Sequence, residues 1–479
     1  MSALRRIASV SVASATAIGL IVPVGVAPRA TAAPCAQTGP AAGASGAAPA
    51  MPVPLPVEHL PIGRKPIDAD DRAPLPRLGL LPHEPGSFNF APLQDQSAVI
   101  PWPNPPGMGN QPAPNAMQQS PNAAPAPAAA VTAPTTSIAG WVDGPASPNN
   151  TFQRFGISGA DLGIVWDNGN PSNDQTLIAF GDTYGDCSVP GQQWRRSTMF
   201  RSPDRALGDG LTVPDGVVGD QSSGSPEDQP SFSKEIIDSL NLVVTEPSVI
   251  PTAGIAVGTT QYVNFMSVKQ WGNPGRWTTN FSAIAASTDN GQNWAVDLAT
   301  IRAAAPNRVP GVRFISGDQN FQQGAFTRPG DGYVYSFGTP SGRGGAAHVA
   351  RVPEGSVLDL TQYEYWNKPF FGNGSWVRNK PSAATAVIPA PVSEMSAQYN
   401  TYLQKYVVLY CNGSNNVVIR TAPAPQGPWS AAQVLVNSTQ IPGGIYAPFV
   451  HPWSSGRDLY FTLSLWSAYS VMLMHTVLP

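Results

Sequence analysis

Apolar runs rich in aromatic residues recur through the C-terminal two thirds of the chain, separated by polar stretches of Gly, Pro, Asn and Ser. Runs of this length, bounded by turn residues, predict β-strands rather than helices. The five strongest begin 53 to 85 residues apart and cover residues 177–184, 262–269, 333–340, 406–413 and 459–466. The spacing indicates five repeated units, each built around one such strand.

Each strong run follows a shorter strand pattern, and most are followed by a third. The shorter patterns cover residues 161–166, 246–251, 323–329, 384–389 and 446–452, and four of them end in proline, which suits the end of a strand. The third patterns cover residues 281–287, 346–352, 416–421 and 470–476. Three or four strands repeated five times predict an all-β fold, a five-bladed β-propeller in which the shorter strands line the axis.

One turn supports this interpretation independently. The segment from Ser287 to Trp294 has the form S-x-D-x-G-x-x-W, a turn motif found in many propellers, and residues 421–429 resemble a degenerate copy. In this motif the aspartate accepts hydrogen bonds from the turn and the glycine takes a positive φ. We therefore expect Asp289 to have a structural role on the outer rim, far from any chemistry.

The N-terminal third predicts export and then a linker. Arg5 and Arg6 precede an apolar stretch, and residues 30–32 (Ala-Thr-Ala) form a small-x-small cleavage site, so residues 1–32 are predicted to be a signal peptide. Residues 33–137 are rich in Pro and Ala and are predicted to be a disordered linker. The propeller would then occupy residues 138–479. We expect a secreted protein, periplasmic or associated with the cell wall, with no membrane span in its mature form.

Composition narrows the classes of ligand. Only 12% of residues are charged and the net charge is −3, so the basic surface that nucleic acid requires is absent, whereas neutral glycans are compatible. The five histidines have no metal-ligand spacing, so we expect no metal and no cofactor, and we expect a monomer. Cys187 and Cys411 lie in the predicted propeller and could pair or be free, whereas Cys35 lies in the linker.

Acidic residues begin or end strands of the first two units. Asp161 begins the first short strand and Asp182 ends the strand that follows it, so antiparallel pairing should bring both carboxylates to one face. Glu246 occupies the same register in the second unit. Grouped carboxylates at the mouth of a propeller suit glycoside hydrolysis, in which one carboxyl donates a proton and another acts as base or nucleophile. The alternative is that Asp161 and Asp182 cap turns beside glycines.

Sugar binding also requires aromatic faces and polar side chains near the acids. Gln323 and Tyr446 lie one position from the register of Asp161 in their own units, whereas the fourth unit offers only Ala384 there. The predicted substrate-binding residues are Trp166, Tyr184, Arg196, Gln323, Tyr446 and Trp466. Four further aromatic residues are candidates for stacking, namely Trp194, Trp271, Trp277 and Trp453.

Four segments carry a resemblance to a known family: G-A-D-L-G-I-V-W, I-A-F-G-D-T-Y-G, D-G-Y-V-Y-S-F-G-T-P with A-A-H-V-A-R-V, and Y-A-P-F-V-H-P-W. From residue 151 to the C-terminus the chain resembles the actinobacterial family known as domain of unknown function 4185, associated with endo-D-arabinanases of glycoside hydrolase family 183. The resemblance implies a five-bladed propeller that cleaves α-D-arabinofuranosyl linkages of mycobacterial arabinogalactan or lipoarabinomannan. It also implies that the family's two essential aspartates correspond to Asp161 and Asp182, whereas Glu246 rests on register alone.

Two functions of different class follow. The first is a secreted endo-D-arabinanase, for which we expect inversion, the outcome of carboxyl groups roughly 6.5–9.5 Å apart rather than about 5 Å. The alternative is a non-catalytic, glycan-binding propeller at the cell surface. A sialidase is disfavoured, because such enzymes need three clustered arginines and a tyrosine nucleophile, and no convincing set is present.

Overall fold

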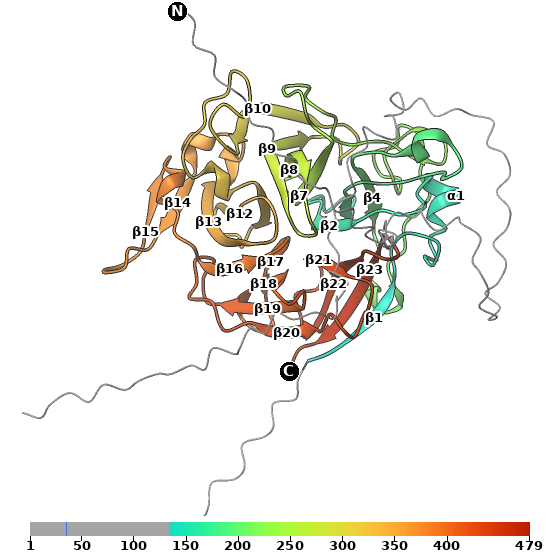
Figure 1. The fold of residues 1–479 in the computed structure, drawn as a ribbon. Helices are drawn as coiled ribbons and strands as arrows, with labels where there is room; N and C mark the ends of the chain where they lie inside the picture. The colour runs from blue at the N-terminus through green and yellow to red at the C-terminus, as the bar shows by residue number, and fades with distance from the viewer. Residues whose placement is uncertain (1–34, 36–133) are drawn as a thin grey trace, which may run out of the picture. The chain divides into compact units, whose positions relative to one another are not determined.

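The computed structural model describes Cys35 and residues 134–479. Their secondary structure is almost entirely β, with one short α-helix, α1 (Thr151–Phe155), and short 3-10 turns at Pro190–Gln193, Leu207–Asp209, Asp318–Asn320, Glu354–Ser356, Leu360–Gln362 and Pro381–Ala383. Five sheets surround a central axis as a five-bladed β-propeller, which confirms the predicted fold (Figure 1). The predicted signal peptide and nearly all of the predicted linker lie outside the described residues.

The five blades follow one another along the chain. Blade one contains β2 (Leu162–Asp167), β3 (Thr176–Phe180) and β4 (Thr198–Ser202), and blade two contains β7 (Ser248–Val257), β8 (Thr260–Trp271), β9 (Trp277–Ser287) and β10 (Ala295–Ala303). Blade three contains β11 (Gln323–Thr327), β12 (Tyr333–Thr339), β13 (Gly345–Pro353), β14 (Glu364–Asn367), β15 (Ser375–Arg378) and β16 (Ile388–Val392). Blade four contains β17 (Met395–Asn400), β18 (Lys405–Cys411), β19 (Val417–Ala422) and β20 (Gln433–Val436). Blade five contains β21 (Ile445–Val450), β22 (Asp458–Leu465) and β23 (Ser470–Val477), and a small sheet of β5 (Glu227–Gln229) and β6 (Phe232–Ser233) lies apart from the blades.

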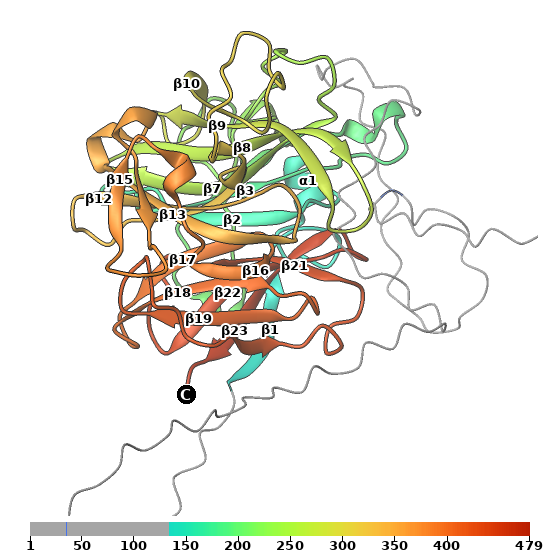
Figure 2. The ribbon, with the colours of Figure 1, turned by 60° about the vertical axis from the view of Figure 1, so that its left-hand side comes forward.

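The ring is closed by a strand that precedes blade one in sequence. Strand β1 (Thr135–Trp141) pairs antiparallel with β23 and becomes the outermost strand of blade five (Figure 2). Just after β1, the buried carboxylate of Asp143 accepts hydrogen bonds from the backbone N–H groups of Val471 (2.6 Å) and Ala160 (2.7 Å), which ties blade five to blade one. Strand β1 therefore belongs to the propeller, although its first three residues fall within the predicted linker.

The inner strand of blade four differs from the prediction. Residues 384–389 were expected to line the axis, but Ile388–Val392 forms β16, which pairs with β13 of blade three. The inner strand is β17, whose sequence M-S-A-Q-Y-N alternates apolar and polar residues over only six positions. The chain returns to blade three at β16 before it enters blade four at β17, so the inner strand of blade four begins later than the pattern predicts. The prediction of Ala384 at the axis is therefore wrong.

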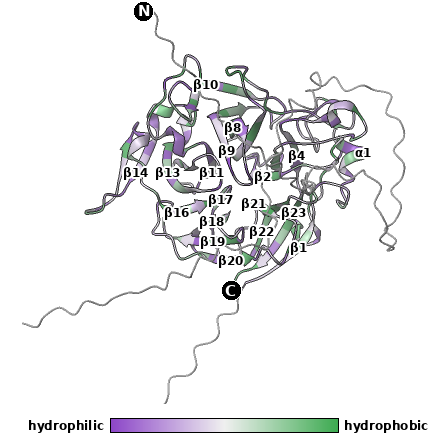
Figure 3. Ribbon diagram, in the orientation of Figure 1, coloured by the Kyte–Doolittle hydropathy of each residue, from purple (hydrophilic) through white to green (hydrophobic). Residues whose placement is uncertain are grey.

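Packing between blades holds the ring together. One hydrophobic cluster joins residues of blades one, two and five, and hydrophobic positions are interspersed with polar ones along the strands (Figure 3). The turn at Ser287–Trp294 links β9 to β10 and contributes to this packing, since the carbonyl of Asn290 accepts a hydrogen bond from the buried Arg201 of blade one (2.8 Å). Within the turn, Asn293 N–H donates to Asp289 (2.9 Å) and Gly291 has a φ of 78°. This geometry agrees with a structural role for Asp289.

Candidate active site

A strained turn positions Asp161 at the start of the inner strand of blade one. The N–H of Gly163 donates to the carbonyl of Asp161 (3.2 Å), and the intervening Leu162 has a φ of 73°. This three-residue turn is unfavourable for a side chain such as leucine and costs about 1–3 kcal/mol. It is held by Ser464 of blade five, whose hydroxyl oxygen accepts from the Leu162 N–H (2.8 Å), and it coincides with a β-bulge between β2 and β3. The bulge redirects the Asp161 side chain.

Pairing of β2 with β3 brings the second aspartate beside the first. The N–H of Gly181 donates to the carbonyl of Asp161 (3.1 Å), and Asp182 is the next residue along the chain. A Cβ atom at Gly181 would lie 2.5 Å from Oδ1 of Asp161, so only glycine permits this approach. The predicted antiparallel pairing of the two strands is confirmed.

The environment of Asp161 favours its neutral form. Its side chain is 1% exposed, Oδ2 accepts a hydrogen bond from the Tyr446 hydroxyl (3.1 Å), and Oδ1 has no partner. Burial, and secondarily the negative charge of Asp182, raise the pKa of Asp161 well above its usual range. The site therefore favours the neutral, protonated form of Asp161.

Asp182 is equally buried but is better supplied with donors. Its Oδ1 accepts hydrogen bonds from the Ser248 hydroxyl (2.7 Å) and from the indole N–H of Trp194 (3.0 Å). Burial raises the pKa of Asp182 to about 6, and these hydrogen bonds and the charge of Arg196 oppose a larger shift. At neutral pH Asp182 is therefore mostly ionised. Two neighbouring carboxyls with opposite protonation states are the arrangement required of an acid paired with a base.

A narrow cavity lies beside Asp161, next to the inner strands of the blades. Residues of all five blades line it: Asp161, Leu162, Ile250, Pro251, Thr252, Met266, Trp271, Trp277, Gln323, Gly324, Glu394 and Phe449. Of the predicted site residues, Asp161 and Gln323 border this cavity directly, and so do two of the stacking candidates, Trp271 and Trp277. Asp182 and Tyr446 are placed around Asp161 instead.

Sequence reasoning missed a third carboxylate, Glu394. It immediately precedes β17, is 8% exposed, and forms an ion pair with Arg343 (Nε to Oε2, 3.0 Å). The Arg343 guanidinium lies over the ring of Tyr446, 5.1 Å from its centroid, so the ion pair supports the residue that donates to Asp161. With β17 as the inner strand of blade four, Glu394 lies one position before the start of that strand, close to the register of Asp161 in blade one.

Three other predicted residues lie on the Asp182 side of the site. The Arg196 guanidinium forms an ion pair with Glu235 (3.2 Å) and lies over the ring of Trp194. Tyr184 is buried against Tyr469, and the partly exposed Trp466 contacts both Tyr446 and Tyr469 edge-on. These side chains form the wall around Asp182 and Tyr446.

Two predicted residues are not brought to the cavity. Trp166 is 4% exposed, at the far end of β2 from Asp161, where its indole N–H donates to Gln261 (2.9 Å) and its ring meets Trp294 edge-on. It packs between blades one and two, as most propeller aromatics do. The Glu246 carboxylate accepts hydrogen bonds from Ser239 and Ser267 and does not line the cavity.

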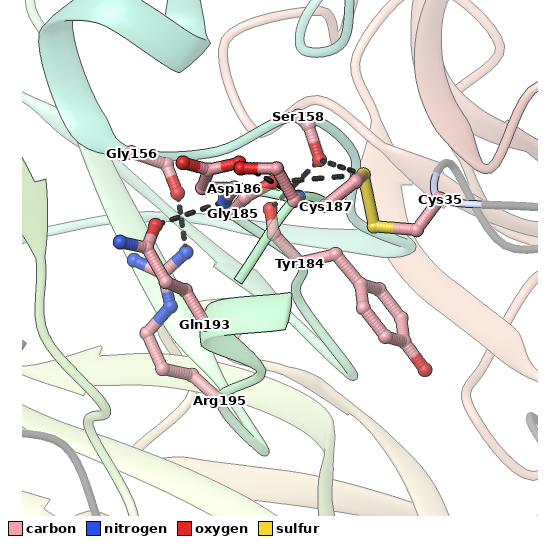
Figure 4. The surroundings of a disulfide bond; sticks show 10 residues. Cys35, Gly156, Ser158, Tyr184, Gly185, Asp186, Cys187, Gln193 and Arg195 are labelled. Atoms are coloured by element: carbon pink, nitrogen blue, oxygen red, sulfur yellow. Dashed lines mark hydrogen bonds between the residues drawn. A yellow bond between two sulfur atoms is a disulfide. The ribbon is translucent and has the colours of Figure 1, made fainter. Parts of the chain in front are cut away.

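A disulfide joins Cys187 to Cys35 (Figure 4). Cys411 is buried and free, so the suggested pairing of Cys187 with Cys411 is wrong. Burial raises the pKa of the Cys411 thiol to about 12, which makes it unreactive. Cys35 packs with Tyr184 and Tyr469, and Trp194 and Trp466 border the same cluster. The disulfide therefore lies next to residues that surround Asp182.

Within residue 35 and residues 134–479, no group of three or more His, Cys, Asp or Glu side chains is arranged to hold a metal ion. In the same described part of the chain, no helix has the length and apolarity needed to cross a bilayer.

The domain of unknown function DUF4185 matches residues 146–475. Among curated proteins, Notoamide biosynthesis cluster protein J of Aspergillus sp. (strain MF297-2) is 27% identical over 330 residues, which cover 66% of this chain and 82% of that protein. Protein J' of Aspergillus versicolor is 27% identical over 349 residues, with coverages of 66% and 83%.

Several solved structures are similar at low identity. A putative hydrolase from Bacteroides ovatus has a TM-score of 0.45 and 15% identity, covering 68% of this chain and 88% of that chain. The α-L-arabinofuranosidase PaAbf62A from Podospora anserina has a TM-score of 0.37 and 13% identity, with coverages of 73% and 98%. An arabinanase from Bacillus subtilis has a TM-score of 0.35 and 10% identity, with coverages of 66% and 94%. Likenesses of this strength carry no argument about activity, which rests on the site itself.

Proposed function

Since the chain belongs to the DUF4185 family through residues 146–475, we propose that it is a glycoside hydrolase with Asp161 as acid and Asp182 as base or nucleophile. The observation that carries the proposal is the pair itself: two buried carboxyls on adjacent strands, one favoured as protonated and the other as ionised, beside a cavity. A pair that only capped turns would not need such different environments.

We propose a role for each carboxyl group from its surroundings. Asp161 lines the cavity and its Oδ1 has no partner, so we propose Oδ1 as the atom from which a proton passes to the glycosidic oxygen. The resulting Asp161 carboxylate remains hydrogen-bonded to Tyr446. Asp182, held by Ser248 and Trp194, activates water or attacks the anomeric carbon. Inversion remains our prediction for the anomeric outcome.

The proposed substrate is a neutral D-arabinan, cleaved at internal α-D-arabinofuranosyl linkages of arabinogalactan or lipoarabinomannan. The support is the resemblance of the first-blade segments that contain Asp161 and Asp182, together with a chain that carries few charges. We further propose that the protein acts outside the cytoplasm. The disulfide between Cys35 and Cys187 supports this location, because such bonds persist in oxidising compartments.

The test is release of arabino-oligosaccharides from purified arabinogalactan. We expect Asp161→Asn and Asp182→Asn each to reduce release by about 10²–10⁴-fold, the usual contribution of an acid or base. Asp297→Asn is the matched control, because Asp297 lies on the outer strand β10 and its carboxylate binds only the nearby Ala299 N–H. Glu246→Gln tests the third predicted catalytic residue in the same assay. Unchanged release by both Asp161→Asn and Asp182→Asn would reject the proposal.

The alternative function, a glycan-binding propeller without activity, gives a different result. It predicts that the protein binds arabinogalactan while no oligosaccharide appears even after long incubation.

A further inference from the structure

Two adjacent phenylalanines at the tip of one hairpin are almost fully exposed. The side chains of Phe370 and Phe371 are 94% and 84% exposed, and their rings meet edge-on with centroids 4.7 Å apart. The tip of a hairpin usually carries small or polar turn residues, whereas apolar side chains grouped on a surface mark a contact with a partner or a membrane. Both rings are therefore available for burial against something outside the chain.

The hairpin that carries these rings is an extension of blade three. Strand β14 pairs with β13 at Glu364 and Tyr365, and β15 forms the outer edge of the sheet. The neighbouring part of β13 pairs with β16 instead, so the rest of the hairpin leaves the sheet and projects from the rim of the ring (Figure 1). Every residue of the tip, 368–373, is exposed.

The base of the hairpin is packed firmly on blade three. Trp366 and Trp376 face each other across the hairpin with ring centroids 5.2 Å apart, and Trp376 also meets Tyr335 edge-on at 6.0 Å. The Arg351 guanidinium lies 4.5 Å from the centroid of Trp376 and forms an ion pair with Glu364 (2.8 Å). The base thus holds the two exposed rings in position before any contact, which reduces the entropy lost on binding.

The same hairpin is positively charged. Residues 367–380 contain Lys368, Arg378 and Lys380 and no Asp or Glu, although the whole chain has a net charge of −3. All three cations are exposed, and Lys368 precedes the two rings by only two residues. Exposed aromatic rings beside cations are the composition of a segment that binds an anionic lipid surface.

The size and shape of the tip favour lipid over a protein partner. Two aromatic side chains can bury roughly 300–500 Å² together, whereas a stable protein interface buries about 800 Å² on each partner. A projecting tip also needs a matching pocket on a protein surface. Fluid acyl chains close around any convex shape, so a bilayer needs no such pocket.

We propose that the β14–β15 hairpin is a lipid-contact site, in which Phe370 and Phe371 insert into the surface of an anionic phospholipid bilayer and Lys368 contacts the headgroup phosphates. The contact is peripheral and reversible, because two rings and a few cations supply far less apolar area than a membrane-spanning segment. The site uses neither Asp161 nor Asp182. The inference therefore goes beyond the proposed function and does not depend on it.

Co-sedimentation of the full chain with vesicles tests this site. Phosphatidylcholine vesicles with about 30 mol% phosphatidylglycerol supply the anionic surface, and pure phosphatidylcholine vesicles supply the neutral one. We expect Phe370→Ser and Phe371→Ser each to lower the partition coefficient about 10-fold, the effect of losing one inserted aromatic side chain. Val244→Ser is the matched control and should bind as the unmodified protein does, because Val244 is also a fully exposed apolar residue but lies in the loop before β7.

A second arm tests the charge. Lys368→Gln should lower binding to the anionic vesicles about 5-fold and leave binding to the neutral vesicles unchanged. Each replaced side chain is exposed, so every variant should keep the Tm of the unmodified protein, and unfolding would not explain lost binding.

Three outcomes would overturn the lipid-contact site. The first is that the unmodified protein does not bind the anionic vesicles, and the second is that the double Phe370→Ser, Phe371→Ser variant binds them equally well. The third is a dimer of the unmodified protein, detected by light scattering, that the double variant no longer forms, because the tip would then dock on a second copy of the chain.

Discussion

At the scale of single residues, Asp161 and Asp182 differ because their partners differ, although both are buried. Asp182 accepts two hydrogen bonds from neutral donors and lies near Arg196. Asp161 accepts one hydrogen bond, from Tyr446, and its Oδ1 atom has no hydrogen-bond partner. Hydrogen bonds to a carboxylate favour its ionised form, and a neighbouring negative charge disfavours it. These surroundings therefore favour the protonated form more strongly for Asp161 than for Asp182.

The first prediction concerns the pH profile. In the proposed mechanism Asp182 acts ionised and Asp161 acts protonated, so activity should rise as pH increases through about 6 and fall at higher pH, where Asp161 loses its proton. Ser248→Ala removes a hydrogen bond that stabilises ionised Asp182, which raises its pKa. The acidic limb of kcat/KM against pH should move upward by roughly 0.5–1 pH unit.

Ser282→Ala is the control for this measurement. Ser282 is a buried serine of the same blade, but its hydroxyl donates to the carbonyl of Phe321 rather than to a carboxylate. An acidic limb that stays in place in Ser248→Ala would contradict the role given to Asp182.

The second prediction concerns stability. Because the pKa of Asp161 is raised in the folded protein, its contribution to stability is complete below the usual value of 3.8 and is lost as pH rises toward the folded pKa. Asp161→Asn removes this loss, so the variant should be more stable than the unmodified protein at neutral pH. Its advantage in Tm should grow as pH rises from about 4 toward neutral pH. A Tm difference independent of pH would show that Asp161 is not held neutral by the fold.

At the scale of elements, the segment between β3 and β4 connects the disulfide to the site. Cys187 lies in this segment, and Trp194, farther along it, donates to Asp182. Closure of a long loop by a disulfide stabilises mainly by restricting the unfolded chain. The segment therefore gains order from a cysteine that precedes the propeller by a long stretch of sequence.

The third prediction follows from this connection. Cys35→Ser should lower the free energy of unfolding by about 2–4 kcal/mol and abolish the sensitivity of Tm to reductant. Thermal unfolding with and without dithiothreitol measures both effects. Cys411→Ser is the control, because Cys411 is buried and unpaired, and its Tm should still fall in reductant. A Tm of the unmodified protein that does not respond to reductant would contradict the prediction.

At the scale of the whole molecule, the site exists only because the ring closes. Blades one, two, three, four and five contribute Asp161, Ser248, Gln323, Glu394 and Tyr446 respectively. Strand β1 completes blade five, and Asp143 fastens that blade to blade one. Any loss of closure would separate Tyr446 from Asp161.

The fourth prediction concerns the charge of the whole chain and the effect of salt on activity. With 12% charged residues, a net charge of −3 and the neutral substrate that we propose, association should not depend on long-range electrostatics. We expect kcat/KM on arabinogalactan to change less than about twofold between about 50 and about 300 mM NaCl. A steep decrease with salt would indicate a charged ligand instead.

The sequence by itself determined the repeated strands, the propeller and the first-blade aspartates. These depend on local apolar runs and on the pairing of consecutive strands, both of which can be seen in the chain. It did not locate Glu394, because the apolar residues just before β17 also fit an inner strand but pair with β13 of blade three. It did not assign β1 to blade five, because that pairing joins opposite ends of the domain.

Only the tertiary structure decided the partners of each group. Contacts between residues far apart in sequence raise the pKa of Asp161 and pair Cys187 with Cys35. Such contacts also bury the indole N–H groups of Trp271 and Trp277 without a partner. Trp166 illustrates the same limit, since only the packing of blade one against blade two shows that its ring is buried. Burial and hydrogen bonding are set by the closed ring, and a linear pattern does not contain them.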